Sequence, residues 1–164
     1  MPSPRKVYLD SCVFLSYVNN DADRAPHIEA LFDEARSHGT EIYTSELSIV
    51  EVAFGRVEQT CQALSPEVEN QIDSLWMPGS AIRLIEYYRL IGDDAKRLMR
   101  LGVTKGWTGL RAMDAIHLST ARRMQVDEFH TYDIQRLKKY SVDAGFPICE
   151  PYSIAPQLPG LTTT

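Results

Sequence analysis

Four acidic residues of this chain either follow a short apolar run or lie close to the apolar face of a predicted helix: Asp10, Glu51, Asp114 and Asp133. Asp10 follows the apolar run 7–9 directly, and Asp133 comes shortly after another strand-like run. Ligands of open α/β sheets bind beyond the carboxyl ends of the strands, so both side chains are expected at that edge. The spacing also places Asp114 and Glu51 close to the apolar sides of their predicted helices. The four carboxylates are therefore candidates for one shared site.

Three of these acids also have a simpler interpretation as helix caps. Asp10, Asp114 and Asp133 each lie at the boundary or in the first turn of a predicted helix, where a carboxylate accepts backbone N–H groups and complements the helix dipole. Each such cap contributes about 1 kcal/mol. Glu51 lies in the middle of its predicted helix, so capping does not explain it. An inward-facing acid at that position needs an Arg or a cation as its partner.

Four carboxylates at one sheet edge point to a divalent cation, because their mutual repulsion prevents all of them from staying ionised alone. A ligand set made of carboxylate oxygens favours a hard ion, Mg²⁺ or Mn²⁺, which keeps several waters and bridges to phosphate. The expected reaction is metal-assisted hydrolysis of a phosphodiester, in which an ion-bound water attacks phosphorus and no covalent intermediate forms. Asp10 and Asp114 are the first choices as direct ligands. Glu51 and Asp133 complete the site directly or through waters. Alternatively, Glu51 positions the attacking water.

The elements that must position these acids alternate between strand and helix. Strands are expected at 7–9, 41–44, 81–85, 128–131 and, as an edge strand interrupted by a proline, 146–149. Helical patterns cover 11–18, 26–37, 45–55, 66–77, 86–103, 112–124 and 134–140, of which 86–103 is one long helix or two short ones. The alternation predicts an α/β fold, a three-layer α/β/α domain with a central, mostly parallel sheet. That domain is expected over residues 1–150, followed by a flexible C-terminal tail over 151–164.

Composition restricts the class of protein. The chain has 164 residues, of which 44% are hydrophobic and 24% are charged, as in one ordinary globular domain. No apolar stretch approaches the ~18 residues of a membrane span, so a soluble, cytoplasmic protein without membrane attachment is expected. The cysteines are too few and too far apart to indicate a disulfide framework or a structural zinc site.

The net charge of −5 conceals an asymmetry along the chain. Residues 1–82 carry thirteen acidic and five basic residues, whereas residues 83–139 carry twelve basic and seven acidic ones. The basic part fits an anionic partner, and a solvated helix surface explains the same charges equally well. Arg89, Lys96 and Arg100 share one face of a predicted helix and are candidates for contact with a nucleic-acid backbone.

Four segments together resemble the acidic motifs of the PIN-domain ribonucleases, in the order that this family has them: VYLDS from Val7, SELSIVEV from Ser45, DAIHLSTA from Asp114 and FHTYD from Phe129. The resemblance extends over residues 6 to about 139 and is closest to the single-domain VapC-type toxins of toxin–antitoxin modules. It implies a metal-dependent endoribonuclease that acts on RNA, commonly as a homodimer, and that a small antitoxin protein blocks. In this resemblance, Mg²⁺ or Mn²⁺ is held by Asp10, Glu51, Asp114 and Asp133.

Three further residues are weaker candidates for substrate binding. Ser11 and Thr131 stand beside the acids and would orient a water or a phosphate, or else cap a helix. Arg111 would meet a phosphate or pair with Asp114. His117 follows Asp114 by one helical turn; a ligand or proton-carrier role is open, but a packed histidine with one hydrogen bond is the favoured interpretation.

Two other functions are open. A haloacid-dehalogenase-like phosphatase also begins with a strand that ends in a nucleophilic Asp, but that class has a second acid two residues later, where this chain has Cys12. Cys12 is itself expected to be a packed thiol. The second alternative is a catalytically silent PIN fold that binds RNA or serves as a scaffold, against which the presence of all four acids argues.

A partner protein that occludes the site is expected to send a basic side chain toward the acids.

Overall fold

A computed structural model describes residues 3–37 and 39–154, and five strands form the centre of this part of the chain. They lie side by side in the order β3-β2-β1-β4-β5, and every pairing between neighbours is parallel. The strands are β1 (Arg5–Leu9), β2 (Thr40–Ser45), β3 (Ile82–Ile85), β4 (Glu128–His130) and β5 (Ile148–Cys149). Each of the five strand predictions is confirmed, and the sheet that was expected to be mostly parallel is parallel throughout the described residues.

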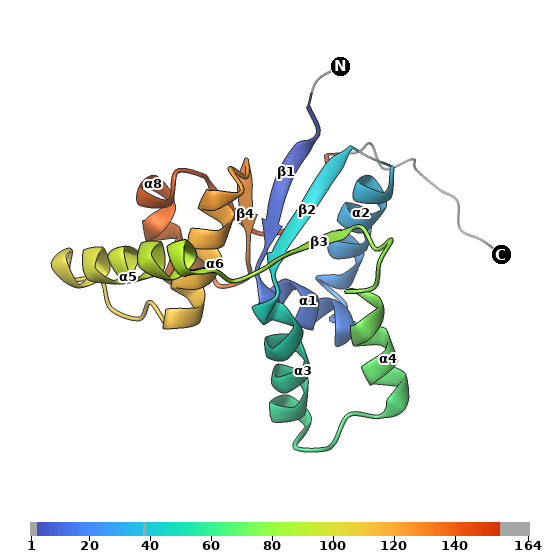
Figure 1. The fold of residues 1–164 in the computed structure, drawn as a ribbon. Helices are drawn as coiled ribbons and strands as arrows, with labels where there is room; N and C mark the ends of the chain where they lie inside the picture. The colour runs from blue at the N-terminus through green and yellow to red at the C-terminus, as the bar shows by residue number, and fades with distance from the viewer. Residues whose placement is uncertain (1–2, 38, 155–164) are drawn as a thin grey trace.

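Helices cover both faces of this sheet (Figure 1). One layer contains α1 (Ser11–Val18), α2 (Ala25–Arg36) and α4 (Pro66–Ser74). The other contains α5 (Arg89–Thr104), α6 (Ala112–Arg123), α7 (Ile134–Leu137), the 3₁₀ turn η1 (Lys138–Tyr140) and α8 (Ser141–Ala144). Helix α3 (Leu47–Thr60) follows β2 and packs against α1 and α4. The expected three-layer α/β/α fold is confirmed.

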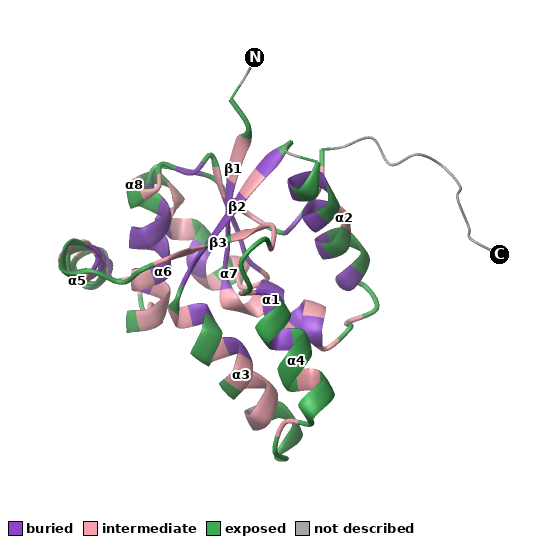
Figure 2. Ribbon diagram, turned by 45° about the vertical axis from the view of Figure 1, so that its right-hand side comes forward, coloured by how far each residue is buried: buried purple, intermediate pink, exposed green. Residues whose placement is uncertain are grey.

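The side chains of β1 alternate between the two cores on either side of the sheet. Val7 and Leu9 pack with α1 and α2, whereas Tyr8 packs with α6. All three are fully buried, and the buried strands lie between the helical layers in Figure 2. Helical layers cover both faces of β1. Asp10 directly follows the last residue of β1 and therefore lies at the carboxyl edge of the sheet, between these two layers. No helix among the described residues is long and apolar enough to cross a membrane.

Helix α3 begins and ends later than its sequence pattern predicts. The pattern places it over 45–55, but Ser45 is still the last residue of β2, and the helix continues past Gly55. A Cβ atom at Gly55 would lie 3.1 Å from Cδ2 of Leu15 in α1. The glycine therefore permits a close approach of two helices and does not end α3. This contact holds α3, and with it Glu51, against α1.

The other helices agree more closely with the sequence pattern. Helix α5 is one continuous helix and not two short ones. Gly92, which raised the alternative of two helices, lies inside it, where the missing side chain leaves room for the ring of Tyr87. Helix α4 is shorter than predicted, and α8 was not predicted at all. The edge position of β5 is confirmed: Pro147 precedes it and has no N–H to donate, and its carbonyl oxygen accepts a hydrogen bond from the backbone of Phe129 at 3.0 Å.

The last four described residues are anchored to the domain. The hydroxyl of Tyr152 donates to Glu128 in β4, and the hydroxyl of Ser153 donates to Glu34 in α2, both over 2.6 Å. The rest of the predicted tail, 155–164, lies outside the described residues. The division of the chain at residue 150 therefore stays a prediction.

Candidate active site

Asp10 lies directly after β1 as the N-cap residue of α1, and it is 7% exposed. Its Oδ1 accepts the backbone N–H of Ser11 at 2.8 Å, and its Oδ2 accepts the hydroxyl of Thr131 at 2.8 Å. The thiol of Cys12 lies 3.5 Å from the same Oδ2. All these donors are neutral, and no cationic side chain in the described part of the chain forms an ion pair with Asp10. Capping is therefore a real role of Asp10, but none of its hydrogen-bond donors brings a positive charge to this buried carboxylate.

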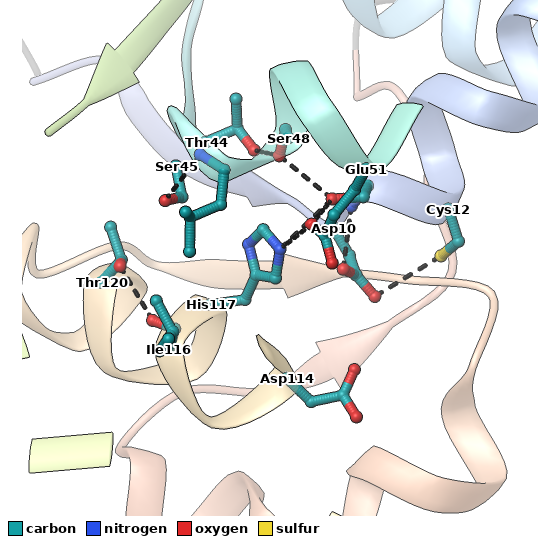
Figure 3. Close-up of polar contacts among 12 residues, drawn as sticks. Asp10, Cys12, Thr44, Ser45, Ser48, Glu51, Asp114, Ile116, His117 and Thr120 are labelled. Carbon is teal, nitrogen blue, oxygen red and sulfur yellow. Dashed lines mark hydrogen bonds and ion pairs between the residues drawn. The ribbon is translucent and has the colours of Figure 1, made fainter. Parts of the chain in front are cut away.

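Glu51 lies in α3 with its carboxylate turned toward His117 of α6 rather than toward bulk solvent (Figure 3). Nε2 of His117 is 2.6 Å from Oε2 of Glu51, and the hydroxyl of Ser11 donates to the same oxygen. Burial opposes ionisation of Glu51, but the hydrogen bond and charge of His117 and the bond from Ser11 lower its pKa below the ordinary value. Ser11 thus contacts two acids, Asp10 through its N–H and Glu51 through its hydroxyl.

His117 is buried, and both of its ring nitrogens have polar partners. Nδ1 lies 2.7 Å from the hydroxyl of Tyr8, which accepts the backbone N–H of Ser45 at 2.9 Å. Since Tyr8 accepts from the backbone, its own proton can point to Nδ1, which leaves the Nε2 proton for Glu51. Burial lowers the pKa of His117, but the surrounding carboxylates, Glu51 first among them, raise it above its ordinary value. The expected packed histidine is present, with more hydrogen bonds than the sequence indicated.

Asp114 and Asp133 share a cation from the chain itself, Arg136 of α7. Nη1 of Arg136 lies 2.6 Å from Oδ2 of Asp114, and its Nε lies 2.7 Å from Oδ2 of Asp133. Asp114 also accepts the backbone N–H of Arg111 at 3.1 Å, which caps the start of α6. Burial raises the pKa of Asp114 above its ordinary value, and the charge of Asp10 adds to this although Arg136 opposes it. Asp114 is therefore influenced by the charge of Asp10 as well as by Arg136.

The four predicted acids lie along one edge of the sheet in two pairs, one joined through Ser11 and the other through Arg136. Thr131 connects the pairs, because its hydroxyl donates to Asp10 and accepts the backbone N–H of Asp133 at 3.0 Å. Neither Arg136 nor the ion pair of His117 was predicted from the sequence. The acids are thus less crowded than expected, since Arg136 lies between Asp114 and Asp133, and His117 is bound to Glu51.

The weaker candidates differ in their surroundings. Ser11 and Thr131 contact the acids as described above. Arg111 is exposed and touches Asp114 through its backbone; within the described residues its side chain forms no ion pair, so the alternative of a pair with Asp114 is wrong. The thiol of Cys12 lies 3.3 Å from the hydroxyl of Thr131, and burial raises its pKa, as suits a packed thiol.

This arrangement defines an α/β/α protein with an acidic site at the carboxyl ends of its parallel strands. The family model of the PIN domain matches residues 7–142. Because the match spans most of the chain, the protein belongs to the PIN domain family.

Solved structures share the fold at low sequence identity. DNA-bound VapBC from Salmonella typhimurium gives a TM-score of 0.66 at 17% identity, over 88% of this chain and 96% of that chain. FitAcB from Neisseria gonorrhoeae gives 0.62 at 14% identity, over 88% and 97%. VapC20 from Mycobacterium tuberculosis, described as a toxin that cleaves the sarcin-ricin loop, gives 0.61 at 13% identity, over 85% and 95%. No curated protein matches the sequence significantly.

Proposed function

We propose that this protein is a divalent-metal-dependent endoribonuclease that hydrolyses phosphodiester bonds of RNA and acts as the toxin of a toxin–antitoxin pair. The observation that carries the proposal is the state of Asp10, a buried carboxylate with neutral hydrogen-bond donors only. A buried negative charge of this kind favours a cation beside it. Membership of the PIN domain family supports a hydrolase that acts on nucleic acid.

The donor set fits Mg²⁺ or Mn²⁺, because it consists of carboxylate oxygens with hydroxyl groups around them. We assign Asp10 and Asp114 as direct ligands, since the hydrogen-bond donors to Asp10 are all neutral and the charge of Asp10 acts on Asp114. Glu51 and Asp133 complete the site directly or through waters. A bound ion of this class lowers the pKa of water and stabilises the negative charge that develops on a reacting phosphate.

The remaining side chains position these acids and the substrate. Ser11 holds the orientation of Asp10 and Glu51 together, and Thr131 holds the second oxygen of Asp10. The hydrogen bond from His117 keeps Glu51 ionised, so that its carboxylate can orient an attacking water. Arg111 is exposed at the start of α6 and is assigned to contact with a substrate phosphate.

Exposed basic residues on α5 support a nucleic-acid substrate, which we propose to be RNA. Arg89, Lys96 and Arg100 are exposed on α5. Lys96 and Arg100 also line a groove between α5 and α6 that contains the ring of Trp107. Phosphates bind to such cations, and bases stack on such rings. An RNA substrate would place the protein in the cytoplasm.

The direct test is cleavage of a mixed-sequence single-stranded RNA by the purified full-length chain, with the matching DNA in parallel. Cleavage of RNA is expected with Mg²⁺ or Mn²⁺, and excess chelator should stop it. Asp10→Asn and Asp114→Asn should reduce cleavage to background without unfolding the protein. Asp73→Asn changes an exposed acid of α4 in the same way and should leave cleavage intact. Cleavage that survives chelator or Asp10→Asn would contradict the proposal, and RNA binding without cleavage would favour the silent scaffold.

A small antitoxin protein and a second copy of this chain are the proposed protein partners. Large apolar side chains are exposed on two helices, with Val50 of α3 67% exposed and Val103 of α5 80% exposed. Such groups mark protein contacts when they gather in patches. Structural neighbours include a toxin–antitoxin complex from Klebsiella pneumoniae. Expression of the active chain alone should arrest the host, and co-expression with its antitoxin should relieve this; harmless expression of an active nuclease would contradict the toxin role. Light scattering of the purified chain tests the homodimer.

A further inference from the structure

A second group of metal-ligating side chains lies on β4 and β5, apart from the carboxylates of the candidate active site. Glu128 and His130 are two positions apart on β4, so their side chains point to the same face of the sheet. Cys149 on β5 is in register with His130, which places its side chain next to the imidazole on that face. One potential ligand atom from each of the three residues lies within 4.8 Å of the other two. The strand register itself therefore brings together a carboxylate, an imidazole and a thiol.

His130 is fully buried, yet one of its ring nitrogens has no hydrogen-bond partner. Nε2 lies 2.8 Å from Oε2 of Glu128, whereas Nδ1 has no partner among the described residues. Burial lowers the pKa of His130 and so favours the neutral imidazole. Since Nδ1 has no partner among the described residues, the neutral imidazole can carry its proton there and turn the Nε2 lone pair toward an ion shared with Glu128. The nitrogen that faces the carboxylate is therefore the expected ligand atom of His130.

The charges around these side chains also favour a cation. Arg5 forms ion pairs with both Glu128 and Glu34, each over 3.3 Å. One guanidinium thus faces two carboxylates, and a divalent ion beside Glu128 would add positive charge there.

We propose that Glu128, His130 and Cys149 form a second cation site, for an ion of the zinc class rather than for Mg²⁺. Zn²⁺ binds imidazole nitrogen and thiolate sulfur, whereas Mg²⁺ is bound by oxygen. Three such ligands leave the fourth tetrahedral position for water. Ligand atoms around Zn²⁺ lie roughly 3–4 Å apart, so side chains whose ligand atoms lie within 4.8 Å need to close by only about 1 Å. Burial raises the pKa of the Cys149 thiol to about 11, and ion binding would release that proton to solvent.

The ion would fasten the edge of the sheet beside the candidate active site. β5 consists of two residues and, within the described sheet, pairs with β4 alone. β4 leads into Thr131, which donates to Asp10. The ring of Tyr152 lies 5.3 Å from the ring of His130, and its hydroxyl donates to Glu128, so the last described residues would cover the ion. A bound ion would therefore cross-link β4 to β5 and stabilise the folded chain.

Co²⁺ is the probe for this site, because a thiolate ligand gives a near-ultraviolet charge-transfer band that carboxylate ligands do not give. Metal-free, full-length protein is titrated with Co²⁺ while its absorption is recorded. One equivalent should build the band, Zn²⁺ should remove it, and millimolar Mg²⁺ should not. The band should be absent from Cys149→Ser and present in Cys61→Ser, the matched control at an exposed cysteine. Glu128→Gln should keep the band and weaken Co²⁺ binding several-fold.

Absence of the band from the wild-type protein would overturn the proposal, and this result does not depend on how any variant folds. A band that is lost in Cys12→Ser and kept in Cys149→Ser would place the thiolate beside Asp10 and would also overturn it. As a second readout, Zn²⁺ should raise the Tm of the wild type and of Cys61→Ser, but not of Cys149→Ser. Each of these results is separate from RNA cleavage, so failure here leaves the proposed nuclease function standing.

Discussion

Nη1 of Arg136 lies 2.6 Å from the carboxylate of Asp114, a residue 22 positions earlier in the chain, and the same guanidinium contacts Asp133. The protein thus supplies its own cation to one half of its acidic site. Asp10, in the other half, has neutral donors only. This asymmetry predicts how a divalent ion and the internal cation affect each other.

We expect Arg136→Gln to bind Mn²⁺ several-fold more tightly than the wild type. Arg136 occupies two carboxylates that the ion needs and repels it, and about 1 kcal/mol of such repulsion corresponds to roughly fivefold in affinity. Calorimetric titration of the metal-free proteins measures this change. Arg97→Gln, which breaks an exposed pair with Asp94 on α5, is the matched control and should not change the affinity. Weaker binding in Arg136→Gln would mean that Arg136 holds the acids in place instead of competing for them.

Two buried tyrosines form a matched pair for testing the support of His117. The hydroxyl of Tyr8 contacts Nδ1 of His117 and the backbone N–H of Ser45, whereas the hydroxyl of Tyr140 has no partner among the described residues. Tyr8→Phe should lower the free energy of unfolding by about 2 kcal/mol, because it leaves two buried polar groups unpaired. Tyr140→Phe should leave that free energy unchanged or raise it. Urea denaturation measures both, and equal losses would contradict the assigned hydrogen bonds.

The position of the acids follows from local sequence, but the position of their partners does not. Asp10 could be placed at the sheet edge because the apolar run 7–9 stops at it, and the parallel topology follows from the alternation of elements. The partner of Glu51, in contrast, is His117, 66 residues away. Their contact depends on how α3 and α6 meet at the end of the sheet, which no periodicity within either helix encodes.

Two further features show the same limit. Arg136 stands three residues after Asp133, so that ion pair has a local signal, but its contact with Asp114 requires the strand order of the sheet. Gly55 indicates a helix end by its propensity, yet packing against Leu15 lets α3 continue through it. Residues at element boundaries are predictable from the sequence, whereas charge pairing and helix ends are decided by tertiary contacts.

The pair of Glu51 and His117 predicts a pH window for stability. His117 lowers the pKa of Glu51 below its ordinary 4.5 although burial opposes this, so that contribution is present above pH 4.5 and is lost as the pH falls through the lowered value. The pKa of His117 is raised above its ordinary 6.5 by Glu51 despite burial. Its contribution is therefore present below pH 6.5 and is lost as the pH rises through the raised value. The pair should stabilise the fold most between about pH 4.5 and 6.5.

Glu51→Gln tests this window in the presence of chelator. The difference in unfolding free energy from the wild type should be about 2 kcal/mol inside the window and smaller on both sides. Glu29→Gln changes an exposed acid of α2 and is the control for general effects of charge. A difference that stays constant from pH 4 to pH 9 would show that the ion pair does not contribute as described.

Asp10 should be the residue through which divalent ions stabilise the fold. An ion that binds the folded chain alone adds about 2.7 kcal/mol to the unfolding free energy at a hundred times its Kd. Asp10→Asn keeps the shape of the side chain and an oxygen for the N–H of Ser11, but it removes the charge. Mn²⁺ should therefore raise the Tm of the wild type and of the control Asp73→Asn, but not of Asp10→Asn. If Mn²⁺ stabilises Asp10→Asn as much as the wild type, Asp10 is not a ligand, whatever the variant does to RNA.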